Sequence, residues 1–204
     1  PIDPVRFIGN RSSGRQGHAI AAALARRGAA TLLVSGPTAE RDPAGVTVTR
    51  VETARDMLEA CRAALPVDVA VCAAAVADWR PAEAAGSKLK KARGKPPSLS
   101  LVENPDILAS LAARGNGRPR LVIGFAAETE KVAENAKAKR ARKGCDWMLA
   151  NDVSTGTDTF GGDSNTIEFV TETGSEGWPR MTKQEVAERL ADRIAANLRA
   201  GAAE

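Results

Sequence analysis

The amino-acid sequence predicts an α/β fold in which a mostly parallel sheet carries helices on both faces. Short apolar segments alternate along the chain with longer segments whose apolar residues recur at helical spacing, and this alternation is typical of a covered parallel sheet. Serine, threonine and asparagine stand where the helical segments begin, and glycine or proline stands where several of them end. We therefore expect a Rossmann-like arrangement, with ligands at the carboxyl ends of the strands.

The ends of the first elements are marked by local residue chemistry. Ser12 or Ser13 can cap the first helix through a side-chain oxygen, and Gly28 suits the position just after its last turn. Thr53 can cap the second helix, which Pro66 closes because proline cannot continue a helix. The expected elements are a helix from Ser12 or Ser13 to Arg27, strands Thr31–Ser35 and Val46–Val51, a helix Thr53–Ala64 and a strand Val67–Ala74.

A polar segment rich in glycine, proline and lysine, Asp78–Pro97, interrupts this pattern and is predicted to be a long mobile loop. Beyond it, Asn104 is expected to cap a helix with Pro105 at its first position, and Thr182 is expected to cap the last helix. The remaining expected elements are strands Leu99–Val102, Leu121–Phe125, Trp147–Ala150 and Thr166–Val170, and helices Thr129–Lys143 and Lys183–Leu198.

Length and composition disfavour several classes of function. A chain of 204 residues can bury a sizeable core, and the only candidate linker, Asp152–Ser164, is short, so residues 1–204 are expected to form a single domain. Aromatic residues make up 3% of the chain and the net charge is +4. Stacking on single-stranded nucleic acid is therefore disfavoured, and a local anion site explains the charge better.

Cysteine use and hydropathy give the expected compartment. Three scattered cysteines and one histidine disfavour a disulfide framework or a structural zinc site and fit a reducing compartment. The sequence contains no signal-peptide pattern and no apolar run of membrane-spanning length. The expectation is a cytoplasmic protein without a membrane or nucleic-acid partner.

The segment GNRSSG, residues 9–14, leads into the first expected helix and is a candidate anion site. A Ser-Ser-Gly turn offers free backbone N–H groups, two hydroxyls and the positive end of a helix dipole. Asn10 and Arg11 suit a ligand that carries a carboxylate or phosphate. The alternative is a capped turn with solvated loop residues, and the glycines do not have the GxGxxG spacing of the dinucleotide fingerprint.

The segment AAAVADWRP, residues 73–81, leaves a strand with small side chains. Small residues let a base or ribose approach the backbone, and Asp78 can contact a ribose hydroxyl or a metal. The alternative is close packing of sheet against helix, with Asp78 as a cap.

Lysines and arginines are concentrated in GSKLKKARGK, residues 86–95. Its glycine-flanked lysines can fold over a polyphosphate, or they can form the basic edge strand that discourages aggregation. Elsewhere, Phe125 at a strand end is core packing by default. Lys139 and Lys143 lie one turn apart on a helix, where they either face solvent or contact a phosphate or base.

Six segments, taken in order, extend over most of the chain: PIDPVRFIGNRSSG, AAVADWRP, KLKK, NPDIL, GFAAET and ANDVS. With these segments the sequence resembles bacterial phosphopantothenoylcysteine synthetase, also called phosphopantothenate–cysteine ligase. In many bacteria this enzyme is the C-terminal half of a bifunctional coenzyme A biosynthesis protein, and the N-terminal half is a flavin-dependent decarboxylase.

The resemblance implies a CTP-dependent reaction with Mg²⁺ in two steps. The carboxylate of 4′-phosphopantothenate attacks the α-phosphate of CTP, which gives an acyl-cytidylate and pyrophosphate, and the amine of cysteine then displaces CMP. It implies catalytic roles for Asn10 and Lys88 and leaves the metal ligands unknown. The implied nucleotide-binding residues are Ser12, Ser13, Gly14, Ala73, Ala74, Ala75, Asp78, Lys88, Pro105, Asp106, Ile107, Leu108, Phe125, Lys139 and Lys143.

The resemblance also implies a homodimer whose active site draws on both subunits. In the family a first strand and a Gly-Gly-Thr-type turn precede the residues that match Pro1–Arg6, so the resemblance implies that both are missing here, together with the decarboxylase half. Two rival functions are a Rossmann-type NAD(P) oxidoreductase, disfavoured by the absent GxGxxG, and a nucleotide-binding or nucleic-acid-binding module. Sequence physics by itself does not select CTP over ATP.

Overall fold

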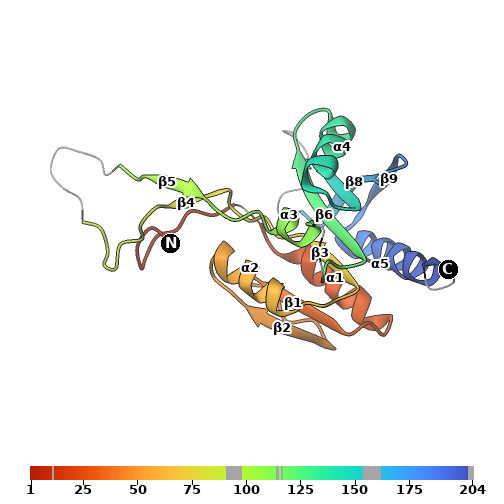
Figure 1. The fold of residues 1–204 in the computed structure, drawn as a ribbon, viewed down its shortest axis with the longest axis horizontal. Coiled ribbons are helices and arrows are strands. Elements are labelled where there is room, and N and C mark those ends of the chain that lie inside the picture. The colour runs from red at the N-terminus through yellow and green to blue at the C-terminus, as the bar shows by residue number, and fades with distance from the viewer. Residues whose placement is uncertain (11, 91–97, 114, 116, 154–161, 202–204) are drawn as a thin grey trace.

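Alternating strands and helices build the molecule, as the computed structural model in Figure 1 shows. The structure describes residues 1–10, 12–90, 98–113, 115, 117–153 and 162–201. The helices are α1 (Arg15–Arg26), α2 (Ala54–Ala63), α3 (Ile107–Ala112), α4 (Val132–Lys143) and α5 (Lys183–Ala200). The strands are β1 (Thr31–Ser35), β2 (Val46–Arg50), β3 (Val69–Cys72), β4 (Trp79–Pro81), β5 (Leu101–Glu103), β6 (Leu121–Glu128), β7 (Trp147–Asp152), β8 (Ser164–Val170) and β9 (Ser175–Thr182).

The largest sheet within the described residues has the strand order β3-β6-β7-β8-β9. β3, β6 and β7 are parallel, whereas β8 and β9 continue the sheet as an antiparallel hairpin. β1 and β2 pair in parallel beside it. The predicted α/β class with parallel strands is confirmed. Because parallel strands end at the same edge, the segments that follow β3, β6 and β7 meet there.

Helices cover both faces of this sheet. On one face α1 and α5 pack against inward side chains of the strands, among them Ile123, Leu149 and Trp178. On the other face the cluster includes Ala136 of α4 and Met148 of β7. The alternate residues of each strand therefore serve two separate cores, which explains the near-continuous apolar runs in β6 and β7.

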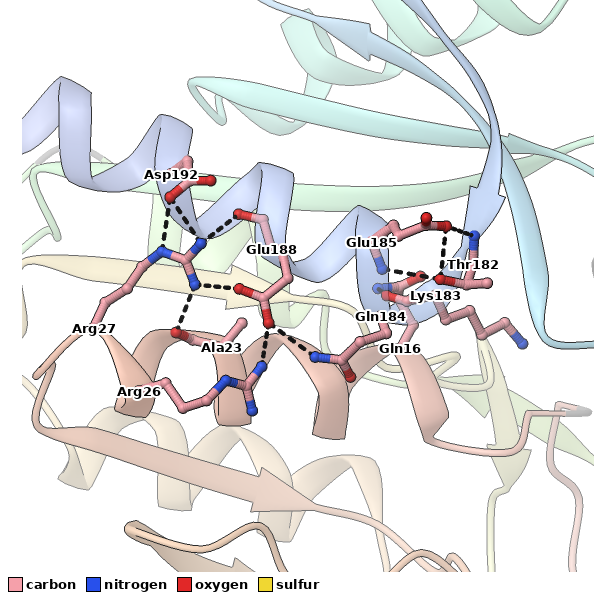
Figure 2. A network of polar contacts seen from close by, with 10 residues as sticks. All are labelled: Gln16, Ala23, Arg26, Arg27, Thr182, Lys183, Gln184, Glu185, Glu188 and Asp192. Atoms are coloured by element: carbon pink, nitrogen blue, oxygen red, sulfur yellow. Dashed lines mark hydrogen bonds and ion pairs between the residues drawn. The ribbon is translucent and has the colours of Figure 1, made fainter.

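Charged side chains join α1 to α5 at the surface (Figure 2). Arg26 and Arg27 both pair with Glu188, and these guanidinium hydrogen bonds, chiefly that of Arg27, lower the pKa of Glu188 to about 2. Near the start of α1, Gln16 Nε2 donates to the Lys183 carbonyl at 3.0 Å. The first turns of α1 and α5 are thereby fixed to each other.

β4 and β5 form an antiparallel pair that extends away from the rest of the molecule (Figure 1). We call residues 79–90 and 98–103 the arm. The N-terminal segment lies beside it, since the Ala85 N–H donates to the Ile2 carbonyl at 2.9 Å. The prediction of one long loop over Asp78–Pro97 is therefore wrong at Trp79–Pro81, which form a strand. Lys91, Arg93 and Lys95 lie outside the described residues.

Other element predictions fared differently along the chain. The capping residues Thr53 and Thr182 are confirmed, each in a reciprocal capping box. β9 was not predicted, because Gly177, Pro179 and several charged residues break its apolar pattern, as an edge strand allows. Among the described residues, no helix has both the length and the apolarity to cross a membrane.

Candidate functional site

The turn Ser12–Gly14 leads directly into α1 at the carboxyl edge of the sheet. The residue at the N-cap is Gly14, with φ 80°, and the helix start has no side-chain cap. The prediction that Ser12 or Ser13 caps the helix is therefore wrong. A Cβ at Gly14 would meet Thr38 Oγ1 at 2.8 Å, so glycine is required by both its conformation and its surroundings.

The same geometry leaves the first turn of α1 open to an anion. The Thr38 hydroxyl is occupied because it donates to the Ser13 carbonyl at 2.7 Å. Among the described residues, Ser12 Oγ and Ser13 Oγ make only long contacts, each 3.4 Å, to backbone N–H groups. Free N–H groups at a helix start attract phosphate or carboxylate. The candidate anion site thus keeps its donors, and Arg11 beside it lies outside the described residues.

Asn10 connects this turn to the segment that follows β3. Its Nδ2 donates to the Val76 carbonyl at 3.0 Å, and its side chain is otherwise exposed. Ala74, Ala75 and Asp78, in the same segment, are also exposed. The structure therefore brings together Asn10 and the stretch Ala73–Asp78, which the sequence placed in one candidate site although more than sixty residues separate them.

The NPDIL segment is held against the same edge. Asn104 does not cap α3. Its Nδ2 donates to the Ala77 carbonyl, and its backbone N–H donates to the backbone carbonyl of Asp78, both at 2.8 Å. Asp106 is the cap instead, because its side chain accepts from the Ala109 N–H at 3.0 Å. The prediction of Asn104 as the cap, with Pro105 in the first turn, is wrong because Asn104 is used to bind the neighbouring loop.

Asp106 also pairs with Lys143 across α3 and α4. Burial by itself would raise the pKa of Asp106, but the hydrogen bonds from Lys143 and Ala109 outweigh it, and the pKa lies below the usual value. Lys139 pairs with Glu128 at 3.4 Å. Both candidate lysines thus have carboxylate partners in this structure, and a phosphate would compete with those partners.

Gly124 sets the distance between β6 and α3. A Cβ there would lie 2.6 Å from Leu108 Cδ2 and 3.0 Å from Met148 Cε, so only glycine lets Leu108 pack this closely. Ile107 is buried in a small core beside α2, and Phe125, the next residue along β6, packs at the edge of the α1–α5 core.

Asn151 is a candidate that the sequence alone did not single out. It lies near the end of β7, and its Oδ1 is buried without a hydrogen-bond partner among the described residues. A buried unpaired amide oxygen is unfavourable, so a donor from a ligand would stabilise it. Its position in the ANDVS segment, directly after the expected strand Trp147–Ala150, was the available signal.

Other chemistry at this edge is limited. Burial raises the pKa of Cys72, at the end of β3, to about 12, so its thiol is a poor nucleophile at neutral pH. No group of three or more histidine, cysteine, aspartate or glutamate residues suited to a metal is present in the part of the chain that the structure describes. The Asp78 carboxylate, in the segment that follows β3, is exposed.

Lys88 lies in the arm, where its side chain is exposed. The following residue, Leu89, is hydrogen-bonded to the N-terminal segment through Asp3 and Arg6. The backbone beside the lysine is thus hydrogen-bonded to the N-terminal segment.

Comparison with known proteins gives consistent matches. Residues 1–198 match the family model described as the DNA/pantothenate metabolism flavoprotein C-terminal domain. A coenzyme A biosynthesis bifunctional protein CoaBC from Mycobacterium tuberculosis is 45% identical over 205 residues, which covers 95% of this chain and 49% of that protein. The chain therefore spans about half the length of this relative.

Solved structures share the fold. The crystal structure of the C-terminal domain of a CoaBC protein is 38% identical, with a TM-score of 0.80 over 97% of this chain and 89% of that one. A Cab2 variant in complex with phosphopantothenate-cysteine has a TM-score of 0.72 at 13% identity, over 98% of this chain and 85% of that one. At that identity the second match shows a common fold.

Proposed function

The chain belongs to the DNA/pantothenate metabolism flavoprotein C-terminal domain family, and on this premise we propose that it ligates 4′-phosphopantothenate to cysteine with CTP as the activating nucleotide. The relatives are named as CoaBC proteins of coenzyme A biosynthesis. A Cab2 variant of the same fold binds phosphopantothenate-cysteine. The observation that carries the proposal is the bond from Asn10 to the Val76 carbonyl, which joins the anion-binding turn to the small-residue strand end.

In the first step, a carboxylate oxygen of 4′-phosphopantothenate attacks the α-phosphorus of CTP. A phosphorus–oxygen bond forms, the bond to the β-phosphate breaks, and pyrophosphate leaves. The N–H groups at the start of α1, with the Ser12 and Ser13 hydroxyls, would hold phosphate oxygens, and Lys88 would neutralise negative charge that develops on the departing group. Mg²⁺ bound to the phosphates would add charge neutralisation.

In the second step, the amine of cysteine attacks the acyl carbon. A carbon–nitrogen bond forms, CMP leaves with the electron pair of the broken carbon–oxygen bond, and the amine loses a proton to solvent or to the departing phosphate. Asn10 would orient the acyl group by hydrogen bonding, and such positioning lowers the barrier of the step. Ala73–Ala75, Asp78, Pro105–Leu108, Phe125, Lys139 and Lys143 complete the proposed nucleotide site.

A homodimer is part of the proposal, and the arm supports it. Apolar side chains on the arm and the adjoining N-terminal segment are exposed, including Phe7 at 77%, Val5 at 63% and Trp79 at 50%. Several large apolar side chains exposed on one part of a molecule favour an interaction site there. A second copy of the chain is the proposed occupant, because the arm extends away from the rest of its own subunit (Figure 1).

The proposal also includes the context of the domain. It treats residues 1–204 as one ligase domain that accompanies a decarboxylase domain in a longer protein, as the bifunctional relatives suggest. It assigns the reaction to the cytoplasm, where the free thiols of Cys61, Cys72 and Cys145 are stable.

The proposal is tested by supplying the protein with CTP, Mg²⁺, 4′-phosphopantothenate and cysteine. We expect stoichiometric release of pyrophosphate and formation of phosphopantothenoylcysteine, and accumulation of the acyl-cytidylate when cysteine is omitted. Mass spectrometry identifies both species. If neither phosphopantothenoylcysteine nor the acyl-cytidylate forms, the ligase function is overturned. Equal turnover with ATP and CTP would overturn the nucleotide preference.

A further inference from the structure

Asp3 is a buried carboxylate in an otherwise exposed segment. Its residue surface is 2% exposed, whereas Val5 and Phe7 nearby are exposed. Oδ1 accepts from the backbone N–H groups of Val5 and Arg6, both at 2.9 Å, and Oδ2 accepts from Arg6 Nε at 3.0 Å. These bonds form a compact turn within the DPVR segment.

A second set of bonds reaches across to the arm. Asp3 Oδ2 accepts from the Leu89 N–H at 3.1 Å, and Arg6 Nη2 donates to the Leu89 carbonyl at 3.0 Å. One ion pair thus engages both backbone groups of a residue 86 positions away from Asp3. A turn that only stabilised the N-terminal segment would need neither bond.

Electrostatics favours this arrangement. The hydrogen bond from the Arg6 guanidinium holds the pKa of Asp3 well below its usual range. Burial opposes this shift, and hydrogen bonds from the Val5 and Leu89 N–H groups add to it. The carboxylate is therefore charged at neutral pH, and the Leu89 N–H bond is a charge-assisted one. Such bonds are shorter and stronger than neutral ones.

The residue directly before Leu89 is Lys88. We propose that Asp3 and Arg6 form a clamp on Leu89 that positions the Lys88 amine for the ligation reaction, so that Asp3 is a positioning residue. The inference rests on the proposed function, because Lys88 is there assigned to the phosphates. Fixing both peptide groups that flank Leu89 restricts the backbone from which the lysine extends, and a misplacement of about 1 Å can lower turnover about a hundredfold.

The central experiment is a double-mutant cycle with Asp3→Asn and Lys88→Gln. Asp3→Asn keeps the size of the side chain but removes the charge that holds both Arg6 and the Leu89 N–H. We expect kcat to fall about tenfold or more, while the KM for CTP changes less than about threefold. In the Lys88→Gln background, Asp3→Asn should change kcat less than about twofold, because the lysine it positions is gone.

The matched control is Asp146→Asn. Asp146 also pairs with an arginine, Arg118, at 3.0 Å and also accepts from a distant backbone N–H, that of Val122, at 2.7 Å. It lies directly before β7, remote in sequence and fold from the arm. This variant should lower the melting temperature but keep kcat close to the wild-type value, which separates loss of stability from loss of positioning.

A readout without activity guards against misfolding and against failure of the ligase proposal. Amide exchange at Leu89, followed by NMR in the folded protein, should accelerate about tenfold or more in Asp3→Asn and not in Asp146→Asn, because a hydrogen bond protects the amide. If the wild-type protein does not ligate, the proposed function fails. An unchanged exchange rate at the Leu89 amide in Asp3→Asn would show, independently of activity, that there is no clamp. Wild-type kcat in a folded Asp3→Asn variant, or an equal loss with and without Lys88, would overturn the positioning role.

Discussion

The sheet with its helices and the arm are stabilised in different ways. The sheet buries large side chains on both faces, such as Trp178 at 1% exposed, which stacks on Phe169 with ring centroids 5.4 Å apart. The arm instead exposes Trp79 and depends on strand pairing and on the Asp3–Arg6 clamp. Apolar side chains buried within the chain hold the sheet in place whether or not a second molecule is bound. An arm with exposed apolar residues is suited to bind a second molecule.

The comparison is tested most strongly by the same substitution in both regions. Trp178→Ala should lower the free energy of unfolding by about 3–5 kcal/mol, the usual cost of removing a buried large aromatic side chain. Trp79→Ala should change it by less than about 0.5 kcal/mol in the monomer, yet weaken self-association. Denaturant unfolding at low protein concentration and analytical ultracentrifugation measure the two effects. Equal destabilisation by both variants would contradict the contrast.

Within the arm, Lys88→Gln should lower turnover about a hundredfold, which corresponds to about 2.7 kcal/mol in the barrier. CTP affinity should stay close to that of the wild type, because other donors hold the nucleotide. Lys90→Gln is the control, since Lys90 is an exposed lysine of the same segment. Similar mild losses in both variants would mean that the arm supplies general positive charge only.

At the edge of the sheet, Asn10→Asp should lower turnover about tenfold or more, because a carboxylate cannot donate to the Val76 carbonyl and repels phosphate. Quench-flow separates formation of the acyl-cytidylate from its reaction with cysteine. Asn135→Asp is the matched control, because Asn135 Nδ2 also donates to a backbone carbonyl, that of Glu130, at 2.9 Å. A folded Asn10→Asp protein with wild-type rates in both steps would remove Asn10 from the site.

The smallest effect concerns the ion pairs between α1 and α5. The pKa of Glu188 falls from 4.5 to about 2 in the folded state, so its contribution to stability is present above pH 4.5 and is lost as the pH falls toward 2. The side chain is 36% exposed, and solvent screening limits the contribution to about 1 kcal/mol or less. Glu188→Gln should remove this part of the acid dependence, as urea unfolding between pH 2 and pH 5 would show. An unchanged pH profile would contradict the assignment.

Much of the fold follows from local signals in the sequence. Apolar runs gave the parallel strands, and Thr53 and Thr182 marked helix starts because hydroxyl caps act through nearby backbone groups. Asn104 was misread because an asparagine before proline can cap a helix or bind another loop, and only the tertiary structure decides between them. The hairpin β8–β9 and the arm depend on pairing partners that periodicity does not reveal.

The sequence predicted which residues belong to the candidate site better than it predicted the contacts that they make. The strand-end rule and the resemblance brought Asn10 and the segment after β3 into one site, and the structure places them in contact. Nothing local to Lys139 or Lys143 indicates their carboxylate partners, Glu128 and Asp106, because those pairs form across elements. Asn151 needed the structure, since an unpaired buried oxygen is a property of the surroundings.

Gly14 restricts how this chain can evolve. Single-nucleotide changes in a glycine codon produce side chains such as alanine, serine, valine or aspartate, and each of them adds a Cβ. At a backbone φ of 80° with Thr38 Oγ1 2.8 Å from the new atom, no such change is a neutral step. A change at Thr38 would relieve the contact but not the strain of a side chain at this φ, so Gly14 should remain glycine even in relatives in which Thr38 differs.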